Sequence, residues 1–238
     1  MYAEMLDVIL VSNYSMKEEL EQSLKSNNYK FHDLMIQDIN HIERYPIDDE
    51  YKTIIIQSAN AIKKIDSSNN HIYNAKYIYG IGPNCRSWVQ RKFSLDCIIP
   101  DHDYSSSGLV EKIKHDKYEL AKTILLKGIG GKTTLQNFLE SENLDHSVCN
   151  VYERVLNEDN LHRVTAMIEN EAIIIAFSKS SVEPLLDKSD IKLDRVHFIV
   201  LDKSDEEIKC DKDVASITKL VDIYDIPDIV EKIKARTK

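Results

Sequence analysis

The glycine loop GIGGK at residues 128–132 is the segment of this sequence whose residue types best suit the binding of an anion. It follows an apolar run, TILLK at 123–127, and precedes Leu135, Phe138 and Leu139, which share one helical face. A loop between a strand and a helix presents main-chain N–H groups and the positive end of a helix dipole to a negative charge. The pattern predicts an anion-binding loop, and the alternative is a tight turn without a ligand.

The loop matches neither of the common nucleotide-binding motifs. A Walker A sequence that ends at Lys132 requires glycine where Leu126 stands. The dinucleotide motif G-x-G-x-x-G requires glycine at the position of Thr133. The sequence therefore does not predict a nucleotide site.

Two further turns could present main-chain N–H groups. The run TIIIQSANAI at 53–62 contains Ser58, Ala59 and Asn60, which are small or polar residues that can also cap the next helix. The run YGIGP at 79–83 is a turn in which glycine lets the backbone approach another group closely. Taken alone, the first turn is more typical of a helix cap than of a binding site, and the same holds for the second.

A tyrosine follows these loops in a segment that reads as extended chain. In CNVYER at 149–154, Tyr152 and Arg154 are two residues apart, so their side chains share one face of a strand. Tyrosine is protonated at neutral pH and can act as a weak acid or a hydrogen-bond donor. An ordinary amphipathic strand would have the same pattern.

The glycines are confined to the middle of the chain. All six lie between residues 80 and 131, whereas the corresponding turns elsewhere carry Asp, Lys and Ser. Glycine gives a loop the backbone freedom that main-chain binding of an anion requires. If a ligand's anionic groups are held by N–H donors, we expect this to happen in the middle of the chain.

The elements that must position these loops are the strands and helices of an α/β fold. Short β-branched runs alternate with helical patterns along the whole chain, which is typical of parallel sheets. Ser15 and Glu18 form an S-x-x-E pattern that predicts a helix start. The predicted strands are DVILV at 7–11, TIIIQ at 53–57, KYIYG at 76–80, TILLK at 123–127, AIIIAF at 172–177 and HFIVL at 197–201.

The sequence also repeats itself at a nearly constant spacing. LVEKIK at 109–114 recurs 120 residues later as IVEKIK, and IIIQSANAI at 54–62 recurs as IIIAFSKSSV at 173–182, with Ser58 and Ser178 also 120 residues apart. A third pair begins at Ile9 and Ile124, an offset of 115. Three repeats in the same order predict two similar α/β halves.

Composition narrows the classes of protein. The chain has 238 residues, 42% of them hydrophobic and 30% charged, and a formal net charge of −9, which disfavours a general nucleic-acid binder. The longest apolar run, AIIIAF at 172–177, is far too short to cross a bilayer, and the amino terminus lacks the features of a signal peptide. We expect a soluble cytoplasmic protein that binds neither membrane nor nucleic acid.

Cysteine and histidine spacing gives no indication of a metal or a disulfide framework. The eight histidines show no H-x-x-x-H pattern, and the four cysteines show no C-x-x-C spacing. The cysteines are Cys85, Cys97, Cys149 and Cys210. We expect reduced, partly buried thiols and no metal site.

In order and spacing, these loops together resemble the uroporphyrinogen-III synthase family across nearly the full chain. The segments that carry the resemblance are SANAI at 58–62, YGIGPNC at 79–85, YSSSGLVEKI at 104–113, KGIGGK at 127–132 and YER at 152–154. The resemblance implies two flavodoxin-like parallel-sheet domains joined by a two-strand linker, with the active site in the cleft between them. It places one discontinuous domain at residues 1–36 and 157–238, the other at 43–148, and linker strands at 37–42 and 149–156.

The resemblance also implies an activity. Members of this family bind the linear tetrapyrrole hydroxymethylbilane, remove its terminal hydroxyl as water, and close the ring with inversion of the last pyrrole to give uroporphyrinogen III. The chain would then be a cyclising lyase of haem biosynthesis that needs no cofactor and acts as a monomer. The alternative is a non-catalytic two-domain sensor that binds a small anion or a tetrapyrrole.

The resemblance assigns roles to individual residues. Tyr152 matches the tyrosine favoured as the donor to the departing hydroxyl. The expected substrate-binding residues are Ser58, Ala59, Asn60, Gly82, Cys85, Gly128, Gly130, Gly131, Lys132, Ser178 and Ser204. Cys85 stands where the family usually has a hydroxyl residue, and Ser204 is the matching hydroxyl of a second-half turn, LDKSDEE at 201–207, that lacks glycine. The acidic run at 202–213 is more typical of a solvated surface segment than of a site.

Overall fold

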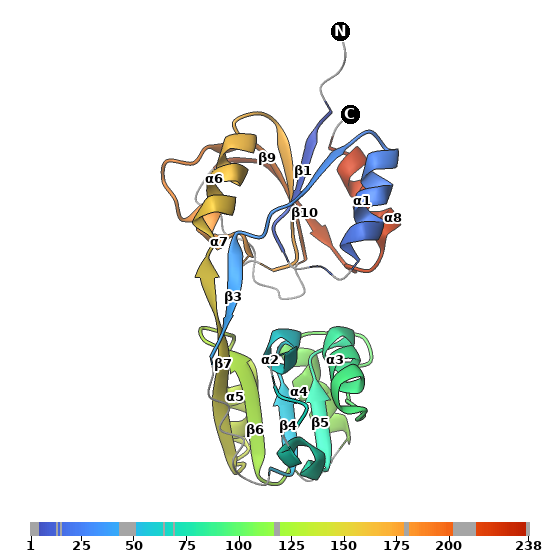
Figure 1. Ribbon diagram of the computed structural model, residues 1–238, viewed down its shortest axis with the longest axis vertical. Coiled ribbons are helices and arrows are strands. Elements are labelled where there is room, and N and C mark those ends of the chain that lie inside the picture. The colour runs from blue at the N-terminus through green and yellow to red at the C-terminus, as the bar shows by residue number, and fades with distance from the viewer. Residues whose placement is uncertain are drawn as a thin grey trace. The chain divides into compact units, whose positions relative to one another are not determined.

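Two five-stranded sheets contain all six of the apolar runs predicted as strands. The chain divides into two compact units, unit 1 (Met1–Asp38 with Val155–Lys238) and unit 2 (Ile39–Arg154), each an α/β sheet with helices on its faces (Figure 1). The predicted α/β class with two parallel-sheet domains is confirmed. The computed structural model describes residues 5–12, 14, 16–42, 51–63, 65–68, 70–116, 120–178, 181–201 and 213–236.

Unit 1 has the strand order β10-β9-β8-β1-β2, and its neighbouring strands pair in parallel. Its strands are β1 (Asp7–Leu10), β2 (Lys30–Asp33), β8 (Ala172–Ala176), β9 (Leu193–Leu201) and β10 (Val214–Leu220). Its helices are α1 (Lys17–Ser26), α6 (Glu158–Met167), α7 (Glu183–Leu186) and α8 (Ile226–Lys234). Helix α1 has Met16 at its N-cap with no side-chain cap bond, and Ser15 of the predicted capping box lies outside the described residues.

Unit 2 has the strand order β3-β7-β6-β4-β5, with parallel pairing from β7 to β5. Its strands are β3 (Gln37–His41), β4 (Thr53–Ile56), β5 (Tyr77–Gly80), β6 (Thr123–Gly128) and β7 (His146–Leu156). Its helices are α2 (Ala59–Lys63), the 3-10 helix η1 (Asn70–Asn74), α3 (Pro83–Phe93), α4 (Ser106–Asp116) and α5 (Thr134–Ser141). A parallel bridge between Tyr79 and Ile98 adds one further paired position beside β5.

Strands β3 and β7 carry the chain from unit 1 to unit 2 and back. The amide of Ile42 donates to the carbonyl of Val151 at 3.1 Å, and the amide of Asn157 donates to that of Ile36 at 3.0 Å. Residue numbers therefore rise along one strand as they fall along the other, so this pair is antiparallel.

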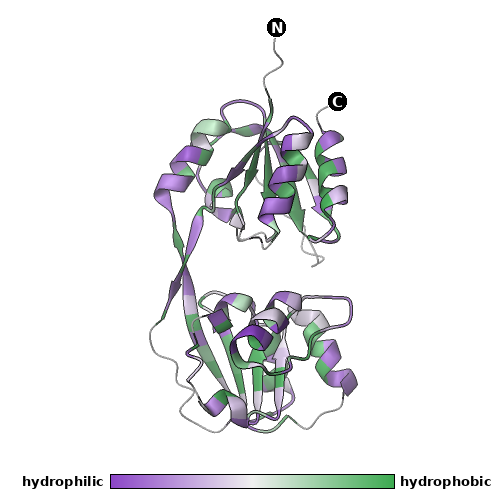
Figure 2. Ribbon diagram, turned by 45° about the vertical axis from the view of Figure 1, so that its right-hand side comes forward, coloured by the Kyte–Doolittle hydropathy of each residue, from purple (hydrophilic) through white to green (hydrophobic). Residues whose placement is uncertain are grey.

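Both faces of each sheet are buried, as expected for parallel sheets covered by helices. In unit 2, Ile54 and Ile56 pack with residues of α2 and α3, whereas Ile55 packs with residues of α4 and α5. In unit 1, Ile9 packs with α6 and α7, and Leu10 packs with α1 and α8. Figure 2 shows the result as hydrophobic strands between helices with hydrophilic outer surfaces.

The sequence repeats fall on equivalent elements of the two sheets. Strands β8 and β1, which occupy neighbouring positions in unit 1, correspond in sequence to β4 and β6, which are neighbours in unit 2. Helix α8 corresponds in sequence to α4, and α1 corresponds to α5. Helices α8 and α1 cover one face of the unit 1 sheet, and α4 and α5 cover one face of the unit 2 sheet. The two units therefore have the same arrangement of strands and helices, but the chain begins at a different element in each, as in a circular permutation. The shared arrangement supports the predicted duplication.

Among the residues that the structure describes, no helix is long and apolar enough to span a membrane.

Candidate functional site

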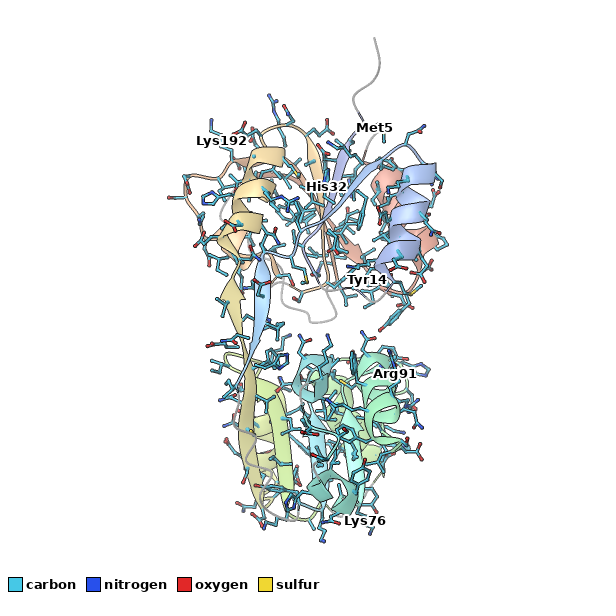
Figure 3. All side chains as sticks on the ribbon, viewed as in Figure 1. Met5, Tyr14, His32, Lys76, Arg91 and Lys192 are labelled. Carbon is cyan, nitrogen blue, oxygen red and sulfur yellow. The ribbon has the colours of Figure 1, made fainter. Side chains whose placement is uncertain are left out.

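The candidate loops of unit 2 follow β4, β5 and β6, so they lie at the carboxyl edge of one parallel sheet. Figure 3 labels Lys76, which directly precedes β5 and marks the opposite, amino edge at the foot of this unit. The side chain of Gln57, at the end of β4, donates from Nε2 to the carbonyl of Lys132 at 2.9 Å. This bond joins the serine turn after β4 to the glycine loop after β6. The structure thus brings together two of the loops that the sequence singled out.

The glycine loop is closed by its own main chain. The amide of Gly131 donates to the carbonyl of Gly128 at 3.0 Å, and the amide of Ile129 donates to that of Tyr152 at 2.8 Å. Gly130 has φ +69°, a left-handed conformation that favours glycine. The amides of Gly130 and Lys132 donate to no acceptor in the described part of the chain. These two N–H groups are therefore free to bind an anion.

Tyr152 lies directly against this loop. Gly128 is paired with Tyr152 between β6 and β7, and a Cβ atom at Gly128 would stand 2.5 Å from Cζ of the tyrosine ring. Only glycine fits beside this ring. The ring is 6.4 Å from that of His41, and the guanidinium of Arg154 lies 5.9 Å from its centroid. Tyr152 is 3% exposed, and its hydroxyl makes no hydrogen bond with the described residues, so it has an unused hydrogen-bond donor.

The turn after β4 combines a serine cap with a partly desolvated lysine. Ser58 Oγ accepts from the amide of Asn60 at 3.2 Å, as a cap does, while the amide of Ser58 itself donates to no acceptor among the described residues. Lys63 donates to Asn60 Oδ1 at 2.9 Å and lies 5.7 Å from the centroid of the Trp88 ring. Burial lowers the pKa of Lys63. Ala59 opens helix α2 between Ser58 and Asn60.

The turn after β5 buries its cysteine. The carbonyl of Gly82 accepts from the amide of Cys85 at 2.9 Å, and a Cβ atom at Gly82 would stand 3.1 Å from Tyr104. Cys85 is 1% exposed, its thiol donates to the carbonyl of Ile56 at 3.8 Å, and burial raises its pKa to about 12. The thiol therefore belongs to the hydrophobic core, where the main chain of Ile81 and Gly82 is hydrogen-bonded to it.

Sequence reasoning missed two residues beneath the glycine loop, Lys127 and Gln57. Lys127 is 5% exposed, and its Nζ donates to the carbonyl of Lys132 at 3.0 Å, the same oxygen that Gln57 contacts. Burial lowers the pKa of Lys127. The available signal was a lysine that ends a strand of otherwise apolar residues. The side chain of Lys132, by contrast, is exposed.

The two remaining predicted residues belong to unit 1. Ser178 follows β8, and its Oγ is hydrogen-bonded to Oγ of Ser181 at 2.7 Å. Ser204 lies outside the described residues. The described edge of unit 2 therefore contains neither of them.

The structure defines a class, a protein of two α/β units with parallel sheets and amide-lined loops at one sheet edge. The family model described as uroporphyrinogen-III synthase HemD matches residues 19–201, more than half of the chain. The chain therefore belongs to the uroporphyrinogen-III synthase family, whose members are cyclising lyases of haem biosynthesis. No curated protein matches the sequence at a significant level.

Solved structures of the family have the same fold. Uroporphyrinogen-III synthetase from Helicobacter pylori is similar with a TM-score of 0.63 and 14% identity over 96% of this chain and 100% of that one. A mutant uroporphyrinogen III synthase from the extremely thermophilic bacterium Thermus thermophilus is similar with a TM-score of 0.59 and 10% identity over 98% of each chain. At these identities the likeness concerns the fold alone.

Proposed function

We propose that this chain closes hydroxymethylbilane to uroporphyrinogen III with loss of water and inversion of the last pyrrole ring, acting as a monomer in the cytoplasm. Beyond the family match, the observation that carries the proposal is a set of unoccupied amides at the carboxyl edge of unit 2. They belong to Ser58, Gly130 and Lys132, which have no acceptor among the described residues. The substrate carries many carboxylates, and main-chain N–H groups are donors suited to carboxylate oxygens.

The net charge of −9 is compatible with an anionic substrate. At physiological salt, charges more than about 8 Å apart are largely screened, so distant surface carboxylates repel the substrate only weakly. Amides and lysines at the loops act on it at contact distance. Lys63, at the end of α2, and Lys127, in β6, add positive charge, because each donates a hydrogen bond to a residue of one of the turns that Gln57 joins. Local donors therefore decide the binding of substrate carboxylates.

We assign the chemical step to Tyr152. A tyrosine hydroxyl that is protonated at neutral pH can donate a proton or a hydrogen bond to the departing hydroxyl of the substrate. Its position against Gly128 holds it beside the loop that would bind the substrate. Loop residues that fix the ends of the linear tetrapyrrole also supply proximity and select which carbon is attacked.

The test of the function is an isomer assay. Purified protein supplied with hydroxymethylbilane should yield uroporphyrinogen III, because the spontaneous reaction gives the type I isomer. Recovery of type I alone would contradict the proposal. Tight binding of the tetrapyrrole without any type III product would favour the non-catalytic sensor instead.

A Tyr152→Phe variant tests the assigned donor. It removes the hydroxyl and keeps the ring that packs on Gly128, so the fold should persist. We expect kcat to fall by about tenfold or more with KM nearly unchanged, as for other positioned acids. An unchanged kcat would show that catalysis depends on the positioning of the substrate and not on the Tyr152 hydroxyl.

A further inference from the structure

A buried lysine and a glutamine fasten the glycine loop at one main-chain oxygen. The carbonyl of Lys132 accepts from Nζ of Lys127 at 3.0 Å and from Nε2 of Gln57 at 2.9 Å. These donors come from the adjacent strands β6 and β4, so the end of the loop is tied to both. The peptide that is fixed in this way directly follows the free amide of Lys132. The two side chains therefore hold in place the residue that carries this amide.

The Lys127 ammonium has no counter-ion in the described part of the chain. Lys112 of the same unit shows the ordinary arrangement, since it lies 3.4 Å from Asp101 and 3.2 Å from Asp116. Burying an ammonium without a carboxylate is costly, and proteins retain such groups where a ligand supplies the opposite charge. Lys127 therefore provides a positive charge directly beneath the free amides.

The hydrogen bond from Gln57 to the loop leaves the other polar atom of its side chain unpaired in the described part of the chain. Because the Lys132 carbonyl can only accept, Gln57 must present its nitrogen to it. Its Oε1 is then enclosed without a donor among the described residues. An enclosed acceptor without a partner is unfavourable, so the bond to the loop is kept at the expense of the other half of the amide.

The equivalent position of unit 1 shows that the fold itself does not need a lysine there. By the sequence repeat, Ser12 corresponds to Lys127 and Phe177 corresponds to Gln57. Ser12 is buried to the same degree, and its Oγ accepts from the amide of Phe177 at 2.9 Å. In unit 1, a neutral hydroxyl thus joins the two loops that correspond to the glycine loop and the serine turn of unit 2.

We propose that Lys127, together with Gln57, is a positioning residue that holds the 128–132 loop with its Gly130 and Lys132 amides directed at a substrate carboxylate, and that its ammonium balances the charge of that carboxylate. The inference rests on the proposed function, since it names how the same site binds its anionic substrate. It adds two residues that act on the substrate through the loop.

The test compares Lys127→Met with Lys127→Arg in steady-state turnover of hydroxymethylbilane. Methionine fills the buried volume but removes the donor and the charge, so we expect KM to rise by about tenfold or more with kcat changed by less than about threefold. Arginine restores both, and KM should return to within about threefold of the unaltered protein. Lys52→Met, an exposed lysine at the amino edge of β4, is the matched control and should leave KM unchanged.

Two further measurements keep the test decisive. Gln57→Leu removes the second donor without changing charge, and its KM should rise by less than that of Lys127→Met. It also tests the loop if Lys127→Met fails to fold. Fluorescence titration with uroporphyrin III, a stable porphyrin with the carboxylates of the product, measures binding independently of turnover.

The outcomes separate the two proposals. Unaltered protein that binds uroporphyrin III but forms no type III isomer overturns the proposed function alone, and Lys127 is then judged by Kd in place of KM. Unaltered protein that does neither overturns both. Lys127 is not a positioning residue for the substrate if Lys127→Met and Gln57→Leu both leave KM and Kd unchanged. The same conclusion follows if the two substitutions lower only kcat.

Discussion

Units 1 and 2 share one sheet arrangement and differ in how they close the loops at its carboxyl edge. In unit 1, side chains do so: Ser12 Oγ accepts from Phe177, and the hydroxyl of Tyr14 donates to the carbonyl of Ile223 at 2.5 Å. Figure 3 labels Tyr14 beyond the carboxyl end of β1 and Met5 ahead of its amino end. In unit 2, the glycine loop is closed by main-chain bonds and by Lys127. The comparison teaches that one duplicated framework can close the loops at the same strand ends with neutral side chains or with a glycine turn and a buried lysine.

The difference also extends to the aromatic residues of the two loops. The ring of Tyr14 packs on Phe177 at 4.7 Å between centroids, and burial raises its pKa to about 12. Tyr152 packs on a glycine backbone and leaves its hydroxyl without a protein partner in the described residues. One tyrosine thus holds a loop through its hydroxyl, and the other does not.

The largest expected effect comes from filling the space beside Tyr152. In Gly128→Ala the new methyl group would stand 2.5 Å from ring carbon Cζ and 2.9 Å from the hydroxyl oxygen, so the buried ring must move. A displacement of about 1 Å at a reacting group can lower turnover by about 100-fold, and we expect a loss of that order in kcat.

Gly130→Ala is the matched substitution in the same loop. Nothing lies within 4 Å of its Cβ position, so only the left-handed backbone opposes the change, at about 1–2 kcal/mol. Its kcat should fall by much less than that of Gly128→Ala. Equal losses in the two variants would mean that contact with Tyr152 is not what requires glycine at 128.

An intermediate effect, on stability rather than activity, is expected in unit 1. Ser12→Ala removes the acceptor of the Phe177 amide, and an unpaired buried amide costs about 1–3 kcal/mol. Urea unfolding should show that loss with little change in KM, whereas Ser26→Ala, at an exposed position on α1, should leave the free energy of unfolding nearly unchanged. A raised KM for Ser12→Ala would show that the unit 1 loops share in substrate binding.

The smallest expected effect concerns the thiol at the glycine turn after β5. Burial raises the pKa of Cys85 from 9.0 to about 12, so the folded thiol stays protonated at pH 8 and should resist iodoacetamide until the protein unfolds. Because the folded pKa is raised, this group stabilises the fold below pH 9 and loses that contribution as the pH rises toward 12. Mass mapping of alkylated peptides checks this. Rapid alkylation of native Cys85 would place its thiol at the loop edge instead of in the core.

Most of the strands that could be predicted from the sequence lie in the interior of their sheets, and β5, at an edge, is the exception. Buried on both faces, they read as continuous apolar runs, as TIII does in β4. Strand β2, with the sequence KFHD, is an exposed or half-buried edge strand without such a run, and β10, with the sequence VASITKL, mixes polar with apolar residues. Neither could be recognised by an apolar run, because partial burial leaves no such signature.

The geometry of the candidate site could be predicted where backbone freedom leaves a mark in the sequence. Gly128 and Gly130 are required for reasons that the structure makes specific, a ring contact and a positive φ. Lys127 was not singled out, because a lysine at a strand end is usually solvated and only the fold reveals its burial. For Cys85 the spacing indicated a turn after β5 but not the direction of the side chain, which points into the core.

The discontinuity of unit 1 has a consequence for the order in which the protein is made. Unit 2 occupies one continuous stretch, so its sheet can form as soon as that stretch has left the ribosome. Strand β1 lies in the interior of the unit 1 sheet, yet its partner β8 pairs Ile9 with Ile174. During synthesis β1 therefore remains without its partner β8 until all of unit 2 has been made. One edge of β1 is uncovered during this time, so the nascent amino-terminal half is the segment most dependent on protection from aggregation.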